Sequence, residues 1–237
     1  MVHREILFLI ELGEQEIQNN MRVLIILILL FFLYSCQKED NADHKKYDLK
    51  TTLELSNYSI SEKKLRDTVK EYAGENKIFF IKGNFDIKNR KKFGWWNVID
   101  KRQVGSSLDI EIIWIDGKEF NNQIIFYRKN KKKDTLRSKF YKTKIIGNSI
   151  EYIFYMPNSN SLTKRNLFAY VISDGNKVIF KEMDSCTQSG NQYYYKLNFS
   201  KYKNKKILIK GLFTERAFNK EDSTVSINEI FTENIIE

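Results

Sequence analysis

Residues 78–100 read "IFFIKGNFDIKNRKKFGWWNVID", and this stretch decides the fold. Two runs rich in aromatic and β-branched residues, 78–87 and 93–100, flank a polar segment, which is the pattern of an antiparallel hairpin. Successive side chains on a strand point to opposite faces, so Trp95 and Trp96 must separate. We expect one of them in the core and the other exposed or covered by a helix.

The same pattern continues toward the C-terminus. Residues 108–116 ("LDIEIIWID") and 122–130 ("NQIIFYRKN") predict two further strands after polar or Gly-containing turns. After residue 137, seven strand-length runs separated by turn residues predict an antiparallel sandwich. These runs are residues 139–146, 149–156, 166–173, 177–182, 191–198, 206–214 and 223–231.

Toward the N-terminus, residues 58–74 ("YSISEKKLRDTVKEYAG") predict one short helix. Ser61 is a good N-cap, and Gly74 supplies a C-terminal stop. The apolar side chains at helical spacing are Leu65, Val69 and Tyr72. Such a stripe favours packing of this helix on a sheet.

These patterns together predict a mainly β protein with one short N-terminal helix. The helix and an antiparallel hairpin sheet occupy residues 51–136, and a β-sandwich-like domain occupies residues 137–237. The composition agrees, because 42% hydrophobic and 14% aromatic residues suffice for a core and exclude pervasive disorder.

The chain is basic, with a formal net charge of +10. Its lysines are scattered and fall mostly at predicted turns, including the clusters in residues 129–133 and 201–206. We interpret this charge as a solvated surface, since net charge governs solubility more than specific binding. Nucleic-acid binding would require Arg or aromatic side chains on a shared face, so we expect no nucleic-acid partner.

The N-terminal segment has the features of an export signal. Arg22 precedes eleven apolar residues, "VLIILILLFFL" at 23–33. A membrane span needs about 20 residues, so this run suits the apolar core of a signal peptide covering residues 1–35. Residues 1–20 carry four glutamates where such a signal should be basic. Synthesis starting at Met21 is the simplest explanation, and a genuine N-terminal extension is the alternative.

The signal-like segment ends in Leu33, Tyr34, Ser35 and Cys36. This order resembles the lipobox of bacterial lipoproteins, although Tyr34 departs from the usual small or hydroxyl residue. The resemblance implies that the Cys36 thiol receives diacylglycerol, and that cleavage makes Cys36 an acylated N-terminus. Two or more acyl chains hold a protein firmly on a membrane. We therefore expect the membrane to be a partner through Cys36.

Residues 36–50 read as a charged tether that follows this anchor. Its beginning, "QKED" after Cys36, resembles the surface-export signal of lipoproteins in Bacteroidota. The resemblance implies an outer-membrane lipoprotein displayed at the cell surface. An ordinary polar tether is the alternative reading of the same four residues.

A second resemblance covers the deciding stretch itself. Residues 83–101 are similar to the MORN-type repeats of bacterial antitoxin-like proteins, in which Gly-aromatic strands and polar turns build successive hairpins. The matching residues are Gly83, Phe85, Lys92, Gly94, Trp95 and Trp96, followed by Trp114, Asp116 and Gly117. Such repeats are scaffolds and imply no reaction by themselves.

Candidate catalytic residues are few. The only histidines, His3 and His44, precede the predicted folded region, so no Ser-His or Cys-His pair can form inside it. Asp109 and Glu111 share one strand face, but exposed strand charges are the simpler interpretation. Cys186 lacks a nearby His and favours a buried small residue over a reactive thiol. We expect no enzymatic activity, cofactor or metal, because no CxxC or Cys/His cluster is present.

The tryptophans supply the remaining candidate site. Trp95, Trp96 and Trp114 are a possible platform for a sugar or a peptide, although aromatic residues in small β domains mostly pack. We therefore expect a non-enzymatic, lipid-anchored envelope protein that binds another envelope protein or a glycan. The alternatives are a carbohydrate-binding or glycan-processing accessory lipoprotein and an immunity or antitoxin-like repeat protein.

Overall fold

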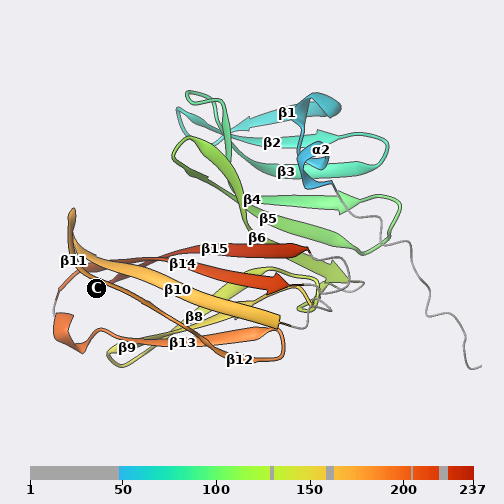
Figure 1. Cartoon of the computed structure of the whole chain (residues 1–237). Coiled ribbons are helices and arrows are strands. Elements are labelled where there is room, and N and C mark those ends of the chain that lie inside the picture. The colour runs from blue at the N-terminus through green and yellow to red at the C-terminus, as the bar shows by residue number, and fades with distance from the viewer. Residues whose placement is uncertain (1–47, 129–130, 159–162, 204, 219–223) are drawn as a thin grey trace, which may run out of the picture. The chain divides into compact units, whose positions relative to one another are not determined.

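The computed structural model describes residues 48–128, 131–158, 163–203, 205–218 and 224–237. The predicted signal peptide, Cys36 and most of the tether lie outside these residues. From Leu49 to Glu237 the chain forms one compact unit. It is mainly β with antiparallel sheets, which confirms the predicted fold class (Figure 1). Among the described residues no helix is long and apolar enough to cross a membrane.

The first sheet, sheet A, has seven strands in sequence order, each antiparallel to the next. The predicted hairpin around residues 88–92 is present, and so are the two strands predicted after it. The strands are β1 (Ser59–Lys64), β2 (Val69–Glu75), β3 (Phe79–Asp86), β4 (Lys91–Asp100), β5 (Ser107–Ile115), β6 (Lys118–Arg128) and β7 (Lys132–Lys133).

The prediction of a helix in residues 58–74 is wrong, because this segment forms the hairpin of β1 and β2. Leu65 lies 47% exposed at the turn, so the expected apolar stripe does not exist. Tyr72 instead stacks on Phe85 of β3 with ring centroids 4.6 Å apart. Pairing with β3 satisfies the backbone of β2 and buries its aromatic side chain, and this tertiary gain overrides helix propensity. The short helix is α2 (Leu49–Thr52), inside the residues predicted as tether and domain start.

One face of sheet A carries the first core. Trp96 is fully buried there and lies over Gly83 of the neighbouring strand β3. Leu53, from the turn after α2, is 2% exposed and packs in the same cluster. The predicted separation of the two tryptophans is confirmed, because Trp95 remains 43% exposed on the opposite face.

The second half of the unit is a sandwich of two four-stranded sheets (Figure 1). Sheet C has the order β11 (Lys177–Asp184), β10 (Thr163–Asp174), β14 (Ile207–Phe218) and β15 (Val225–Ile236). Sheet B has the order β12 (Thr187–Ser189), β13 (Gln192–Asn198), β9 (Ser149–Tyr155) and β8 (Phe140–Ile146). Aromatic side chains of both sheets fill the core, among them Phe154, Phe168, Tyr193 and Phe213.

Sheet A and the sandwich meet at the edge of β15. The pairing of β5 with β6 shifts register between Glu111 and Ile112, so Asn122 is an extra residue in β6. The Asn122 side chain accepts a hydrogen bond from the Phe231 N–H at 2.7 Å and donates one to the Phe231 carbonyl oxygen at 2.9 Å. One side-chain amide thus pairs with the edge of β15 as a neighbouring strand would.

We predict that Gly83→Ala lowers the free energy of unfolding by about 1–3 kcal/mol, the usual range for overpacking. A Cβ atom at this position would lie 2.2 Å from the Trp96 ring. Urea denaturation followed by tryptophan fluorescence measures the loss. The substitution Trp96→Leu removes the clash, so the double variant should lose less stability than the sum of the single variants. Simple additivity would show that the two residues do not interact.

Candidate functional site

The three tryptophans do not form one surface. Trp96 is inaccessible, and Trp95 projects from the opposite face of sheet A. Trp114 is half-buried, and its indole N–H donates to the Lys92 carbonyl oxygen at 2.6 Å. Trp114 is the only one of the three that lines a described cavity, a cleft at the edge of β15.

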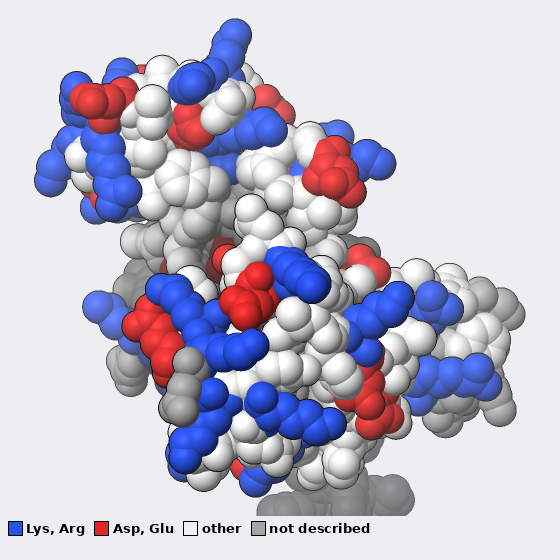
Figure 2. All heavy atoms as spheres, turned by 90° about the vertical axis from the view of Figure 1, so that its left-hand side faces the viewer, with Lys and Arg blue, Asp and Glu red and all other residues white. Residues whose placement is uncertain are grey.

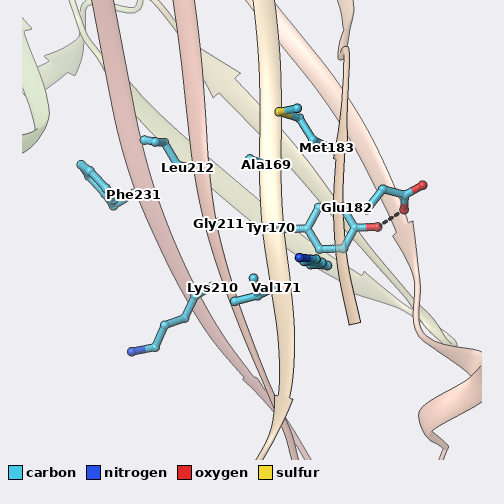
Figure 3. A pocket seen from close by; sticks show the side chains of 10 residues that line it. Ala169, Tyr170, Val171, Glu182, Met183, Lys210, Gly211, Leu212 and Phe231 are labelled. Atoms are coloured by element: carbon cyan, nitrogen blue, oxygen red, sulfur yellow. Dashed lines mark hydrogen bonds between the residues drawn. The ribbon is translucent and has the colours of Figure 1, made fainter. Parts of the chain in front are cut away.

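The outer face of sheet C carries a shallow apolar groove of about 560 Å³. The register places Met183, Ala169, Leu212 and Phe231 opposite one another on four successive strands. Figure 3 shows these side chains as a row across the sheet. Met183 is 64% exposed. The sequence pattern does not predict this groove, which is a continuous apolar surface on the side of the sheet that faces away from the sandwich core.

Charged side chains flank this groove. The next row along the strands places Lys181 and Lys210 on either side of Val171. Lys210 Nζ lies 3.1 Å from a Glu233 carboxylate oxygen, and both side chains are more than half exposed. The floor of the groove is therefore apolar, and the ammonium groups of Lys181 and Lys210 lie at its border.

A cleft of about 590 Å³ adjoins the groove at Phe231, between the edge of β15 and the end of β5. Its lining mixes apolar, aromatic and acidic side chains with a hydroxyl and an amide. The lining residues are Glu111, Ile113, Trp114, Ile115, Asp116, Asn122, Tyr141, Lys210, Gly211, Phe231, Thr232 and Glu233.

The bulge in β6 organises one wall of the cleft. Asn122 and Gln123 both donate to Glu111 Oε2, at 2.7 and 2.8 Å. The Gln123 side chain also accepts a hydrogen bond from the Tyr141 N–H at 3.0 Å. Burial and the nearby Glu111 carboxylate raise the pKa of the Tyr141 hydroxyl. Glu111 is therefore held in place by amide groups, and the phenol beside it stays protonated.

Thr232 belongs to the lining of the cleft as a residue, but its side chain lies on the face of β15 that is turned toward the sandwich core. Its side chain is 4% exposed, and its Oγ1 has no hydrogen-bond partner among the described residues. It lies opposite Gly211 on β14, a position where a larger residue would collide with Thr232 and Phe168.

The remaining chemical candidates are engaged in the fold. Asp109 shares the outer face of sheet A with Glu111, as predicted, and accepts a hydrogen bond from Asn97 at 2.7 Å. Burial and a bond to Asp109 raise the pKa of Tyr127 to about 12. Burial raises the pKa of the Cys186 thiol to about 12, so a thiolate is disfavoured at neutral pH. Among the described residues no cluster of three His, Cys, Asp or Glu could hold a metal.

One carboxylate is completely buried inside the sandwich. Glu215 accepts hydrogen bonds from the Tyr193 hydroxyl and from Asn228, the latter at 3.1 Å. Lys164 Nζ lies 4.0 Å away. Burial and the bond to Glu215 raise the pKa of Tyr193. Because these polar groups satisfy one another, the cluster supports the core, and we assign it no ligand.

Charge is dispersed over the face shown in Figure 2. Lysine and arginine side chains alternate there with aspartate and glutamate, and apolar atoms separate them. The positive net charge is therefore not gathered into one basic patch on this face.

Comparisons of the chain with family models, with curated proteins and with solved structures find no match.

A partly buried lysine joins the two parts of the unit beside this site. Lys139 pairs with Ile124 of β6, and its Nζ donates to the carbonyl oxygens of Asn121 and Glu229, at 2.9 and 3.0 Å. Burial lowers the pKa of Lys139 to about 8, an effect that the Glu229 carboxylate partly opposes. The ammonium group thus links β6 to β15, although its burial there disfavours the charged form.

We predict that Lys139 makes the free energy of unfolding rise as the pH increases from about 8 to about 10.5. In that window the unfolded chain binds the Lys139 proton and the folded chain does not, so the free energy of unfolding increases. Below pH 8 the amine is charged in both states, and its burial costs the full amount. Urea denaturation of the wild type and of Lys139→Met at pH 7 to 10.5 gives the difference. The wild type should gain up to about 3 kcal/mol relative to the variant, whereas parallel curves would contradict the buried charge.

Proposed function

We propose that the protein is a lipid-anchored protein of the cell envelope that binds another envelope protein and catalyses no reaction. Acyl chains on Cys36 hold it on the outer membrane, and the tether carries the β unit away from the lipid surface. The "QKED" segment after Cys36 supports display at the cell surface.

The observation that carries the binding role is the apolar groove on sheet C. A sandwich strand normally alternates between core side chains and polar outer side chains. In β10 the outer positions Leu167, Ala169 and Val171 are apolar as well. Exposed apolar surface of this kind marks interaction sites. The lysines beside it suit a partner that inserts an apolar side chain flanked by acidic residues.

The chemistry of the acidic and thiol groups supports a binding role over catalysis. Asp109 and Glu111 are held by amide donors, and the Cys186 thiol is buried. General acid–base work requires groups whose pKa lies near the working pH and that reach a substrate. A partner encoded beside this protein, such as a toxin, would fit the same groove and would favour the immunity alternative.

We predict that Cys36→Ala releases the protein from membranes, because anchoring would depend on the acyl chains alone. Fractionation of cells after a high-salt wash measures the distribution between membrane and soluble fractions. Cys186→Ala is the matched control and should stay with the membrane, since Cys186 lies in the core of the sandwich. Retention of the Cys36→Ala variant in the membrane fraction would exclude anchoring by Cys36.

We predict that a charge at the centre of the groove disrupts partner binding. A photoreactive residue at position 212, introduced in intact cells, should cross-link one envelope protein. With that protein purified, Leu212→Asp should weaken the complex at least tenfold, because burial of a leucine contributes about 1.5–3 kcal/mol.

The matched control is Ile145→Asp, on the edge strand β8 at 58% exposure. It should leave the affinity unchanged. Equal cross-linking from positions 145 and 212, or equal weakening by the two substitutions, would show that the groove is not the binding surface.

A further inference from the structure

One side of the sandwich is closed over only part of its length. The strand β12 pairs with Gln192–Tyr194, whereas β13 continues to Asn198. Before β12 begins, residues 185–186 carry the chain across from β11 of sheet C. Residues 195–198 of β13 therefore have β9 on one side and, within the described part of the chain, no strand on the other.

The backbone of β13 points two residues toward this open edge. In an antiparallel sheet, residues whose N–H and C=O groups face one neighbouring strand alternate with residues that face the other. The Phe199 N–H donates to the Asn148 carbonyl oxygen at 2.8 Å, on the side of β9. The odd-numbered residues of β13 thus face β9, so the N–H and C=O groups of Lys196 and Asn198 face away from the sheet. Such an edge is a template for another strand.

A cavity of about 340 Å³ lies beside the same edge, between β11 and the end of β13. Ile172 and Leu197 line it, although both belong to the sandwich core and are at most 2% exposed. Phe180 of the edge strand β11 and Tyr195 add aromatic rings to its walls. The gap left by the short β12 therefore opens onto core side chains, which a complete strand would cover.

The polar groups inside this cavity already have partners. The Tyr170 hydroxyl donates to Glu182 Oε2 at 2.6 Å, and the Tyr195 hydroxyl donates to the Tyr170 oxygen at 3.5 Å. The ring centroids of Tyr170 and Tyr195 are 5.8 Å apart. A guest in the cavity would thus contact aromatic rings and aliphatic groups, which favours an apolar side chain.

The rim of the cavity selects charge. Lys196 and Lys201 both line it, and Lys196 Nζ lies 3.4 Å from a Glu151 oxygen, with a side chain that is 61% exposed. Side chains directly opposite each other on neighbouring strands share one face of the sheet. In an added strand, a residue opposite Lys196 would lie outside, where a negative charge is favourable. Residues opposite Tyr195 and Leu197 would point into the cavity.

We propose that β13 accepts an extended segment of a partner protein as an added antiparallel strand, in line with β12. The backbone of Lys196 and Asn198 pairs with the segment, its apolar side chains enter the cavity, and an acidic side chain lies beside Lys196. Addition of a strand to an open sheet edge is an established mode of peptide recognition. This inference does not depend on the groove or on the anchor at Cys36, because the residues that test it belong to neither.

Amide hydrogen exchange, followed by NMR on the full chain in detergent, tests the edge directly. In the free protein the Lys196 amide should exchange rapidly, whereas the Leu197 amide, which faces β9, should be protected. The probe is a blocked hexapeptide in which leucine and phenylalanine alternate with glutamates. At saturation it should slow exchange at Lys196 at least tenfold. A slow Lys196 amide in the free protein, or no binding of the peptide, overturns the proposal.

Two methylated peptides distinguish strand addition from contact by side chains alone. Methylation of the peptide nitrogen opposite Lys196 removes a backbone donor, so the dissociation constant should rise roughly tenfold or more. Methylation of the next nitrogen along the peptide, which faces away from β13, is the matched control and should leave the affinity unchanged. Equal effects of the two methyl groups would overturn the proposal, because the backbone would then make no directed bonds.

A charge exchange tests the register of the added strand. Lys196→Glu should weaken binding of the glutamate peptide roughly three- to tenfold and strengthen binding of a peptide with lysines in their place. Lys118→Glu makes the same change of net charge on sheet A and should alter neither affinity. Leu212→Asp, in the groove, should also leave peptide binding unchanged, which separates this site from the groove. Equal effects of Lys196→Glu and Lys118→Glu would overturn the assignment, as would a dimer of the chain that the peptide dissociates, since a second copy would then occupy the edge.

Discussion

The hydrogen bonds between the Asn122 amide and the backbone of Phe231 hold the two halves of the folded unit together. A strand at the edge of a sheet exposes unpaired N–H and C=O groups that must be paired or covered. At Phe231 of β15 this need is met by the Asn122 side chain, which lies in the bulge of β6. Lys139 adds a second link from the same region to Glu229. Without the extra residue in β6, the hydrogen bonds between Asn122 and the edge of β15 would be lost.

This junction also explains why two different surfaces lie next to each other. Phe231 contributes its backbone to the bonds with Asn122, while its side chain ends the apolar row on sheet C. Its ring lies 5.8 Å from that of Phe120 on β6. One side of this residue therefore belongs to an apolar groove and the other to a polar cleft. The position of β15 therefore determines the lining of both the groove and the cleft.

Strand periodicity and turn residues predicted most of the fold, because β side chains alternate wherever one face is buried. The burial of Trp96 and the exposure of Trp95 follow from this alternation. The first hairpin was missed because Leu65, Val69 and Tyr72 also match a helical period, and only contact with Phe85 decides between the two. The groove and the cleft could not be predicted. They depend on the bulge at Asn122 and on which strands become neighbours, and single-sequence patterns carry neither.

The position of β15 in the sequence has a consequence for how the chain reaches its final form. Asn122 precedes its partner Phe231 by 109 residues, and Lys139 precedes its partner Glu229 by 90 residues. Synthesis runs from the N-terminus, so β6 and β8 are complete long before the strand that they hold. Until β15 arrives, β14 has one open edge and the junction is absent. Contacts between such distant residues form slowly. The junction between sheet A and the sandwich therefore closes only when the last strand of the chain is available.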